Sequence, residues 1–233
     1  MSRQSSRPRR SILAWLWRGV LLAMLVDGLY LARIWPDWQQ LAQGPIPRSS
    51  FIQTYLEERP AHEDWPPLHW TPISQRQLPR TLMRAVVVAE DARFYEHNGF
   101  DLQALREAMD YNLERGELRY GASTISQQTV KNLFLSSSRD PLRKWHEALL
   151  TWAMERHLSK RRILDLYLNV AEFGLGVYGA EAASQAYFQH SAATLSASEA
   201  AQLAASLPNP KHDNPATHTR AFSRRAAKIA RRI

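Results

Sequence analysis

Three polar stretches of this chain carry the side chains that could do chemistry. AEDARFYEHNGFD covers residues 89–101, GASTISQQTVKNLFL covers residues 121–135, and RKWHEALLTWAMERHLSKRRILDLYLN covers residues 143–169. They place carboxylates, amides and cationic groups where a plain helical bundle would have leucine and alanine. The sequence around them favours helices, so helices must position these groups.

Glu90 is the first candidate for acid–base chemistry. It follows the apolar run of residues 85–89, so it stands at the end of a core element rather than on a solvated face. Partial burial would raise its pKa toward the working pH, which suits a general base that accepts a proton from a sugar hydroxyl. Glu147 is the second candidate, because two carboxylates flanking a glycosidic bond are the usual apparatus for sugar transfer and cleavage. The two are far apart in the sequence, so the fold must bring them together.

The second stretch has the residue types of a binding surface for sugar hydroxyls and phosphate oxygens. Ser123 and Thr124 suit a turn or cap that leads into a helix. Amides and an ammonium group then fall on adjacent helical turns, at Gln127, Gln128, Lys131 and Asn132. A solvated polar face is the ordinary alternative for such residues. From Ser123 to Thr129 only Ile125 is apolar, and a simple amphipathic surface helix would not be polar all round.

Four cations gather in the next segment, at Lys131, Arg139, Arg143 and Lys144. Arginine binds phosphate through paired hydrogen bonds, and lysine adds a point charge. Such a cluster would neutralise a diphosphate leaving group as a glycosidic bond breaks. The alternative is an ordinary helix salt bridge between Arg143 and Glu147, since an i, i+4 pair contributes about 0.3–0.5 kcal/mol.

His97 and Asp101 could suggest a metal site, but no second histidine stands at ligand spacing. We favour a structural histidine that holds the loop around Gly99 by hydrogen bonds. Asp91 has two open roles, to position this loop or to contact a substrate. We therefore predict no metal site among these residues.

The elements that must position these groups are helices. Strand-like alternation is nearly absent, and residues 102–114 are amphipathic with a helical period. Capping signals mark three more helices, which begin after Asp140, Ser159 and Ser196. Residues 36–78 are rich in proline and show little periodicity, which predicts a linker and an irregular lead-in. The sequence thus predicts a mainly α domain over residues 79–233.

The N-terminus predicts a membrane anchor. A basic segment, residues 1–11, precedes a mostly apolar run over residues 12–35, long enough for the roughly 20 residues that a spanning helix needs. Asp27 costs about 2.5–3.5 kcal/mol against about −5 kcal/mol from the aliphatic side chains, so insertion is slightly favourable. The arginines before the run predict a cytoplasmic N-terminus, with the remaining chain on the outer side. A cleaved signal peptide is the alternative, but no convincing cleavage site follows Leu31.

Composition narrows the class of partner. The chain has 233 residues, 45% of them hydrophobic, no cysteine, and a formal net charge of +8. Disulfides and thiolate metal sites are excluded, and the basic excess favours an anionic partner such as a phosphorylated substrate or lipid. Residues 220–233 predict a basic amphipathic helix that either lies on a membrane surface or packs on its own domain. We expect no nucleic-acid partner, because no recognised binding motif accompanies the charge.

Together, the three stretches resemble the signature motifs of glycosyltransferase family 51, the peptidoglycan polymerases that act on lipid II. The resemblance covers roughly residues 79–215, and EDARFYEHNGFD, GASTISQQTVKNLFL and RKWHE are intact at the key positions. It implies a lysozyme-like α-helical domain with a small jaw subdomain, preceded by one transmembrane helix. It also implies polymerisation of lipid II and the growing glycan strand into β-1,4 linkages, with inversion and release of undecaprenyl diphosphate.

The resemblance also implies roles for single residues. Glu90 would be the base for the acceptor hydroxyl, and Glu147 would assist at the donor diphosphate, alone or through Mg²⁺ or Mn²⁺. The substrate-binding residues would be Asp91, Phe94, His97, Ser123, Thr124, Gln127, Gln128, Lys131, Asn132, Arg139, Arg143 and Lys144. No cofactor is required by this interpretation.

The same resemblance implies a setting for the protein. It places the chain in the bacterial inner membrane, with the catalytic domain in the periplasm and partners in the division or elongation machinery. Neither Ser-x-x-Lys nor Lys-Thr-Gly occurs, so we expect a monofunctional enzyme without transpeptidase activity. Two alternatives stay open: a lysozyme-like lytic muramidase and an inactive, membrane-tethered cell-wall scaffold.

Overall fold

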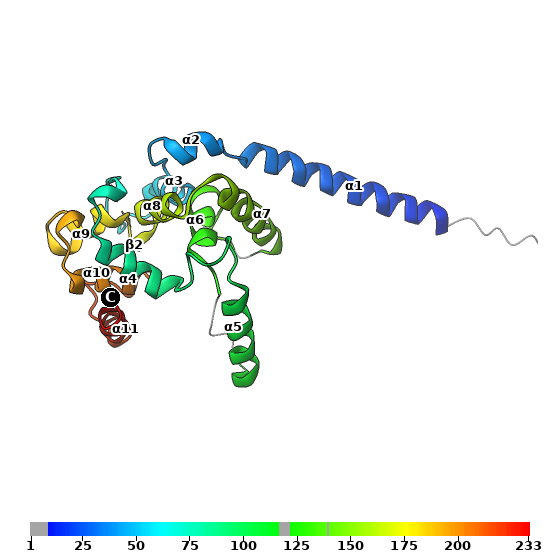
Figure 1. Ribbon diagram of the computed structural model, residues 1–233. Helices are drawn as coiled ribbons and strands as arrows, with labels where there is room; N and C mark the ends of the chain where they lie inside the picture. Colours follow the sequence, from blue (N-terminus) through cyan, green and yellow to red (C-terminus); the bar gives the residue numbers. More distant parts are fainter. Residues whose placement is uncertain (1–8, 117–121, 139) are drawn as a thin grey trace, which may run out of the picture. The chain divides into compact units, whose positions relative to one another are not determined.

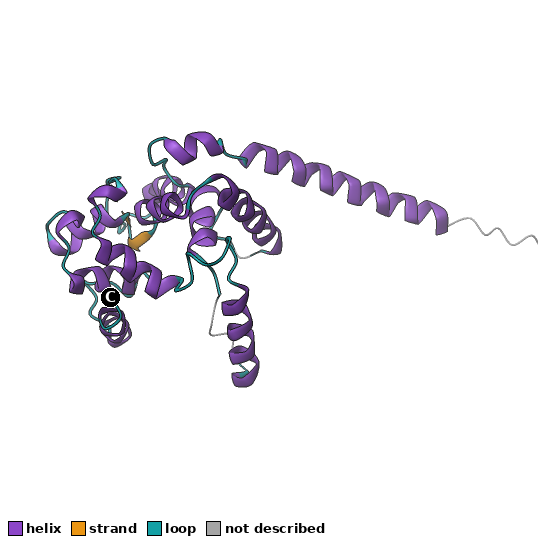
Figure 2. Cartoon of the chain, in the orientation of Figure 1, coloured by secondary structure: helices purple, strands orange, loops and turns teal. Residues whose placement is uncertain are grey.

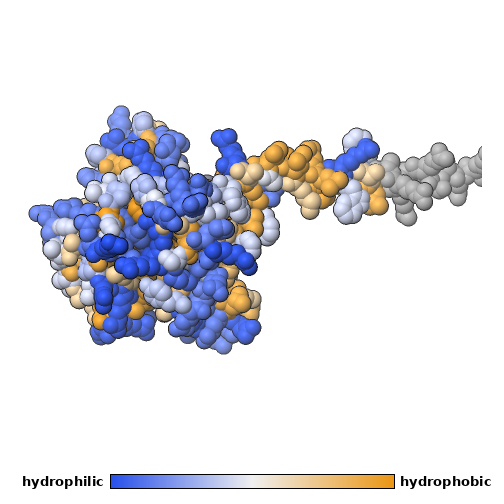
Figure 3. Space-filling model, turned by 45° about the horizontal axis from the view of Figure 1, so that its top comes forward, coloured by the Kyte–Doolittle hydropathy of each residue, from blue (hydrophilic) through white to orange (hydrophobic). Residues whose placement is uncertain are grey.

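The computed structural model describes residues 9–116, 122–138 and 140–233, which form two units divided after Asp37. The first unit holds the helix α1, Arg9–Ile34. Its 26 residues span about 39 Å at a helical rise of 1.5 Å per residue, more than the roughly 30 Å of a hydrocarbon core. Most of its described large apolar side chains are exposed, as the hydrophobic surface of this helix in Figure 3 shows. Of the described residues, only this helical region is long and apolar enough to cross a membrane.

The second unit, Trp38–Ile233, is mainly α, which confirms the predicted fold class (Figures 1 and 2). Its helices are α2 Trp38–Gln43, α3 Ser50–Glu58, α4 Arg80–Glu90, α5 Leu102–Arg115, α6 Ile125–Phe134, α7 Pro141–His157, α8 Lys160–Val170, α9 Ala180–Phe188, α10 Ala197–Ser206 and α11 Arg220–Ala230. Short 3-10 helices cover Arg59–Ala61, Gln75–Gln77 and Ala192–Thr194. The strands β1 His69–Trp70, β2 Glu172–Gly174 and β3 Val177–Tyr178 form a small sheet in the order β1-β3-β2, with β1 parallel and β2 antiparallel to β3.

The predicted capping residues begin their helices. The side chains of Asp140 and Ser159 accept hydrogen bonds from backbone N–H groups in the first turns of α7 and α8. Ser196 forms a reciprocal capping box with Glu199 at the start of α10. Local hydrogen bonds therefore fix where α7 begins, and with it the register of the candidate residues on that helix.

Residues 36–78 differ from the irregular lead-in that we predicted. They contain α2 and α3, and the compact unit begins at Trp38 rather than at residue 79. Trp38 and Leu41 on α2 and Ile52 and Tyr55 on α3 are buried. The two helices have only six and nine residues, which is too short to show a clear helical period. The surrounding prolines therefore favoured the prediction of an irregular segment.

Helix α8 lies in the core and packs against α6, which carries several of the candidate residues. Its residues 163–170 are all buried. Helix α6 packs against both α7 and α8, and α10 packs against α4 and α11. This packing holds α4, α6 and α7 in fixed positions within the second unit.

The C-terminal helix α11 packs on its own domain. Phe222, Ala226 and Ile229 on one face are buried, and the helix contacts α10 and α4. Of the two alternatives for this segment, packing on the domain is therefore the one observed.

Helix α5 stands apart from the core of the second unit. None of its residues is buried, and Figure 1 shows it projecting from the helices around it. Its exposed apolar side chains are Leu102, Leu105, Met109 and Leu113. Among the described elements, α5 is the best fit to the small subdomain that the resemblance implies.

Candidate active site

Glu90 is the last residue of α4 and borders an open pocket. Leu82, Ala85 and Val86 on the same helix are buried, whereas Glu90 is partly exposed. The pocket has a volume of about 290 Å³, and its walls come from α4, α5 and the segments next to them. A substrate hydroxyl can therefore reach the carboxylate from this side.

The surroundings of Glu90 shift its pKa toward neutrality. Burial raises the pKa of this carboxyl above its ordinary value. A hydrogen bond of 2.8 Å from Gln128 Nε2 to Glu90 Oε2 lowers the pKa, as do the charges of Arg225 and Lys131, while Asp91 adds to the rise. Glu90 thus combines a raised pKa with one oriented donor, which suits a general base.

Glu147 lies in a cationic cluster on α7. Its carboxylate is 2% exposed, accepts a hydrogen bond from Arg143 Nη1 at 2.7 Å, and contacts Lys144 Nζ. The i, i+4 salt bridge that we considered from the sequence is therefore present. Two cations share one carboxylate, so this group of side chains keeps a net positive charge.

Lys131 on α6 connects the two glutamates electrostatically. Burial lowers the pKa of its ammonium, and the charges of Glu147 and, more weakly, Glu90 raise it. Its Nζ lies 5.8 Å from the centre of the Phe51 ring, and among the residues that the structure describes no carboxylate lies within salt-bridge distance of it. Glu90 accepts a hydrogen bond from Gln128, one turn before Lys131 on α6, and α6 packs against α7, which carries Glu147, so the fold brings both glutamates next to α6. The partly buried ammonium suits a phosphate oxygen.

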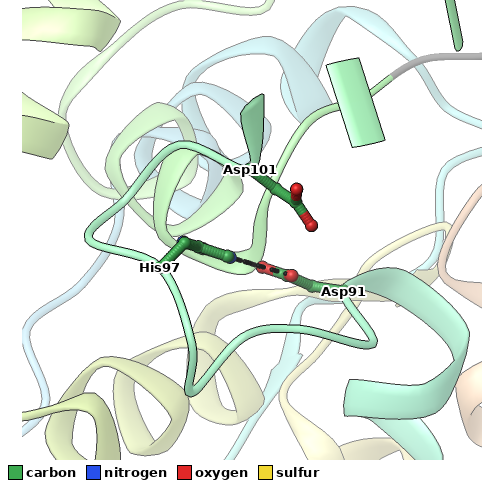
Figure 4. A group of neighbouring side chains, drawn as sticks. All are labelled: Asp91, His97 and Asp101. Atoms are coloured by element: carbon green, nitrogen blue, oxygen red, sulfur yellow. Dashed lines mark hydrogen bonds and ion pairs between the residues drawn. The ribbon is translucent and has the colours of Figure 1, made fainter. Parts of the chain in front are cut away.

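The loop that follows Glu90 is held by a network around Asp91 and His97 (Figure 4). His97 Nε2 lies 3.0 Å from Asp91 Oδ1, and the backbone N–H of Gly99 donates to His97 Nδ1 at 3.2 Å. Asp91 also accepts a hydrogen bond of 3.0 Å from the backbone N–H of Ile125, the first residue of α6. The network ties the end of α4 to the start of α6, which supports the structural interpretation of His97.

Asp91, His97 and Asp101 together resemble a small metal cluster, because their ligand atoms lie within 4.8 Å of one another. All three side chains already make hydrogen bonds within the protein. Arg93 donates to both oxygens of Asp101, at 2.9 and 3.0 Å, and in Figure 4 no dashed line joins Asp101 to the other two. The donor set therefore fits an internal hydrogen-bond network better than a cation.

The structure separates the predicted substrate-binding residues into two groups. Those that reach solvent near the glutamates are Ser123, Gln128, Lys131, Arg143 and Lys144. Those that are buried are Asp91, Phe94, Thr124, Gln127 and Asn132. His97 is partly buried in the network above, and Arg139 lies outside the described residues. Asp91 and Thr124 of the second group also line the pocket beside Glu90.

Phe94, Thr124 and Gln127, for which substrate contact was predicted, also have partners within the protein. Phe94 is 0% exposed, and Lys160 Nζ covers its ring at 4.5 Å from the centre. Thr124 Oγ1 donates to the carbonyl oxygen of Gly99 at 2.7 Å, and Gln127 Oε1 accepts from the backbone N–H of Thr124 at 3.0 Å in a capping box. Thr124 and Gln127 hold the first turn of α6. Their partners are backbone groups, which the sequence pattern does not reveal.

Two residues near Glu90 were missed in the sequence. Tyr167 on α8 donates a hydrogen bond of 3.0 Å from its hydroxyl to Gln128 Oε1. Arg225 on α11 acts on Glu90 through its charge. A tyrosine inside the apolar run of α8 could have been found, because a buried phenol needs a hydrogen-bond partner. Nothing distinguishes Arg225 from the other arginines of its segment.

His97→Ala tests the structural role of this histidine. The change leaves the N–H of Gly99 without its acceptor and Asp91 without one donor, so we expect the free energy of unfolding to fall by about 1–3 kcal/mol. Chemical denaturation measures this loss. His212→Ala, at an exposed histidine, is the control and should stay within about 0.5 kcal/mol of the parent. An unchanged stability in His97→Ala would show that the network does not hold the loop.

Comparison with known proteins gives the family. A family model described as Transglycosylase matches residues 62–233. The chain belongs to the transglycosylase family, in agreement with its helical fold and its acidic and cationic groups. The chain is also similar to proteins named biosynthetic peptidoglycan transglycosylase. It is 42% identical to the one from Thiobacillus denitrificans over 95% of this chain and 96% of the relative. It is 40% identical to the protein from Methylobacillus flagellatus over 93% of this chain and 95% of the relative. It is 48% identical to the protein from Bordetella pertussis over 70% of this chain and 69% of the relative.

Proposed function

We propose that this chain is a peptidoglycan glycosyltransferase that polymerises lipid II into β-1,4-linked glycan strands, with inversion and release of undecaprenyl diphosphate. The observation that carries the proposal is the partly buried Glu90, which lines an open pocket and shares the neighbouring Lys131 with the cationic cluster around Glu147. The names of the relatives support the same class of reaction.

In the proposed reaction, Glu90 accepts the proton of the 4-hydroxyl of the acceptor sugar. The hydroxyl oxygen attacks the anomeric carbon of the donor from the face opposite the diphosphate. The new carbon–oxygen bond forms as the bond to the diphosphate breaks, so the configuration inverts. The electron pair of the broken bond leaves on the diphosphate oxygen.

The cations would stabilise the charge that develops on this leaving group. Lys131 and Arg143 offer donors in a partly buried setting, where such interactions are stronger than in water, and Lys144 adds an exposed ammonium. Glu147 pairs with Arg143 and Lys144, so we propose that it holds these two cations in place for the diphosphate.

A divalent cation at the donor diphosphate would need oxygen ligands from the protein. Glu147 is the candidate in the cluster, but its two oxygens are engaged by Arg143 Nη1 and Lys144 Nζ. These residues fit a divalent cation poorly, and the proposed reaction passes through no metal ion.

For α1 we propose an uncleaved anchor in the inner membrane, with a cytoplasmic N-terminus and a periplasmic catalytic domain. Its length and its exposed apolar surface support this role, and a signal sequence would meet the same criteria. The intact mass of the protein from the membrane fraction separates the two. A mature chain that lacks the residues of α1 would contradict the anchor.

Incubation with lipid II and, separately, with finished sacculi tests the proposed function. We expect glycan polymer from lipid II and no soluble muropeptides from sacculi. Soluble muropeptides without polymer would identify a lytic muramidase, and inactivity on both substrates would favour the inactive scaffold.

Arg143→Ala separates diphosphate binding from a purely structural salt bridge. Lys144 still pairs with Glu147 in this variant, so the fold keeps one partner for the buried carboxylate. We expect kcat/KM for lipid II to fall roughly 10- to 100-fold, the effect of a lost hydrogen bond to a charged group, with a smaller loss of stability. Activity and Tm are measured on the same preparation.

The control for Arg143→Ala is Arg156→Ala, at an exposed arginine on the same helix that packs over Trp152. It should leave kcat/KM at the parental value. Proportionate losses of activity and stability in Arg143→Ala would favour the simple salt bridge.

A further inference from the structure

Tyr167 begins a chain of hydrogen bonds that runs from the core to the pocket. It is 1% exposed and lies between Leu166 and Leu168 on α8. Its hydroxyl donates to Gln128 Oε1 at 3.0 Å, and Gln128 Nε2 donates to Glu90 Oε2 at 2.8 Å. Three helices, α8, α6 and α4, thus contribute one side chain each to a continuous relay.

The hydroxyl of Tyr167 selects one orientation of the Gln128 amide. A phenol that donates to Oε1 leaves the NH₂ group to face Glu90, whereas the flipped amide would set its oxygen against the carboxylate. Burial raises the pKa of the Tyr167 phenol well above its ordinary value, so the hydroxyl keeps its proton at any working pH. The donor at the start of the relay is therefore permanent.

We propose that Tyr167 is a positioning residue for the proton acceptor: its hydroxyl fixes the amide of Gln128, which in turn holds the carboxylate of Glu90 toward the pocket. This inference rests on the proposed role of Glu90 as the general base. It gives Gln128 a positioning role beside the substrate contact predicted for it.

The charged groups that act on Glu90 come from three elements, and a change at Tyr167 leaves them in place. Asp91 follows Glu90 at the end of α4, Lys131 stands on α6, and Arg225 stands on α11. Among the described residues, Gln128 alone donates a hydrogen bond to Glu90. If the amide is free to turn away, the carboxylate loses this donor and its pKa rises further.

Tyr167→Phe tests the relay, because it removes the hydroxyl and retains the ring. We expect the acid limb of the pH profile of kcat/KM for lipid II to move upward by about 0.5–1 pH unit, the effect of one lost hydrogen bond to the base. The direction follows because a higher pKa leaves less of the carboxylate form at a given pH. A merely structural role would lower activity at every pH and leave the limb in place.

Tyr187→Phe is the matched control. Its hydroxyl donates to the carbonyl oxygen of Phe173 at 3.0 Å and takes no part in the relay. We expect its acid limb to coincide with that of the parent. An equal shift in Tyr187→Phe and Tyr167→Phe would overturn the inference.

A double-mutant cycle keeps the test valid if Tyr167→Phe is poorly folded. Gln128→Leu alters a partly exposed side chain and should by itself move the acid limb upward by at least as much. In the Gln128→Leu background, Tyr167→Phe should add no further shift, because the group it orients is gone. Additive shifts, or an unmoved limb in Gln128→Leu, would contradict the relay.

The failure of this inference can be told from failure of the proposed function. If Glu90→Gln polymerises lipid II at the parental rate, the base itself is wrongly assigned. If Glu90→Gln is inactive while Tyr167→Phe keeps the parental acid limb, the positioning role of Tyr167 fails by itself.

Discussion

Glu90→Gln is expected to lower kcat for lipid II polymerisation by about 10²–10⁴-fold, the usual contribution of a positioned general base. The amide has the size of the carboxylate but accepts no proton in the working pH range. Its carbonyl oxygen can still accept the hydrogen bond from Gln128 Nε2, so the geometry of the site is kept. The rate of glycan formation from lipid II measures the loss.

The stability of Glu90→Gln provides the control for this prediction. Burial raises the pKa of Glu90 in the folded state, so the folded state binds this proton more tightly than the unfolded chain does. As the pH rises through the pKa of Glu90 in the unfolded chain and then through its pKa in the folded protein, ionisation of Glu90 therefore lowers the free energy of unfolding of the parent. We expect the variant to gain stability relative to the parent as the pH rises from the ordinary pKa of a glutamate carboxyl through the raised pKa of Glu90 in the folded state. A variant that loses both stability and activity at neutral pH would indicate a structural role for Glu90.

Lys131→Met is expected to lower kcat for lipid II by about 10²–10³-fold, the effect of removing one donor from a developing negative charge. Stability should stay level or rise. The ammonium is partly buried and, among the described residues, has no carboxylate within salt-bridge distance, so methionine removes a desolvated charge and retains the length of the chain.

The control for Lys131→Met is Lys228→Met, at an exposed lysine on α11. It should change neither kcat for lipid II nor the free energy of unfolding. Turnover of lipid II and chemical denaturation are compared for both variants. A Lys131→Met protein that is less stable but polymerises at the parental rate would show that Lys131 serves the fold and not the diphosphate.

Features that depend on neighbouring residues were predicted well from the sequence. The caps at Asp140, Ser159 and Ser196 act within a single helical turn, so the local pattern contains both partners of each hydrogen bond. The salt bridge between Arg143 and Glu147, which the sequence offered only as an alternative, is likewise local. Helices α2 and α3 were missed because they are stabilised by the burial of a few side chains against the rest of the domain.

Features of the candidate site that depend on long-range partners could not be predicted. The sequence left two roles open for Asp91, because one of its partners is the backbone N–H of Ile125, far along the chain. Likewise, Gln128 meets Tyr167 and Glu90 only in the folded protein. A motif therefore indicates which polar residues matter, whereas the fold shows which long-range partners each of them has.

The claim on which the proposal depends is that Glu90 removes the acceptor proton beside a cationic diphosphate site. The most direct test measures lipid II binding and glycan synthesis on one preparation of Glu90→Gln. We predict binding at the parental affinity and glycan synthesis slower by about a hundredfold or more. Glycan synthesis at the parental rate would contradict it.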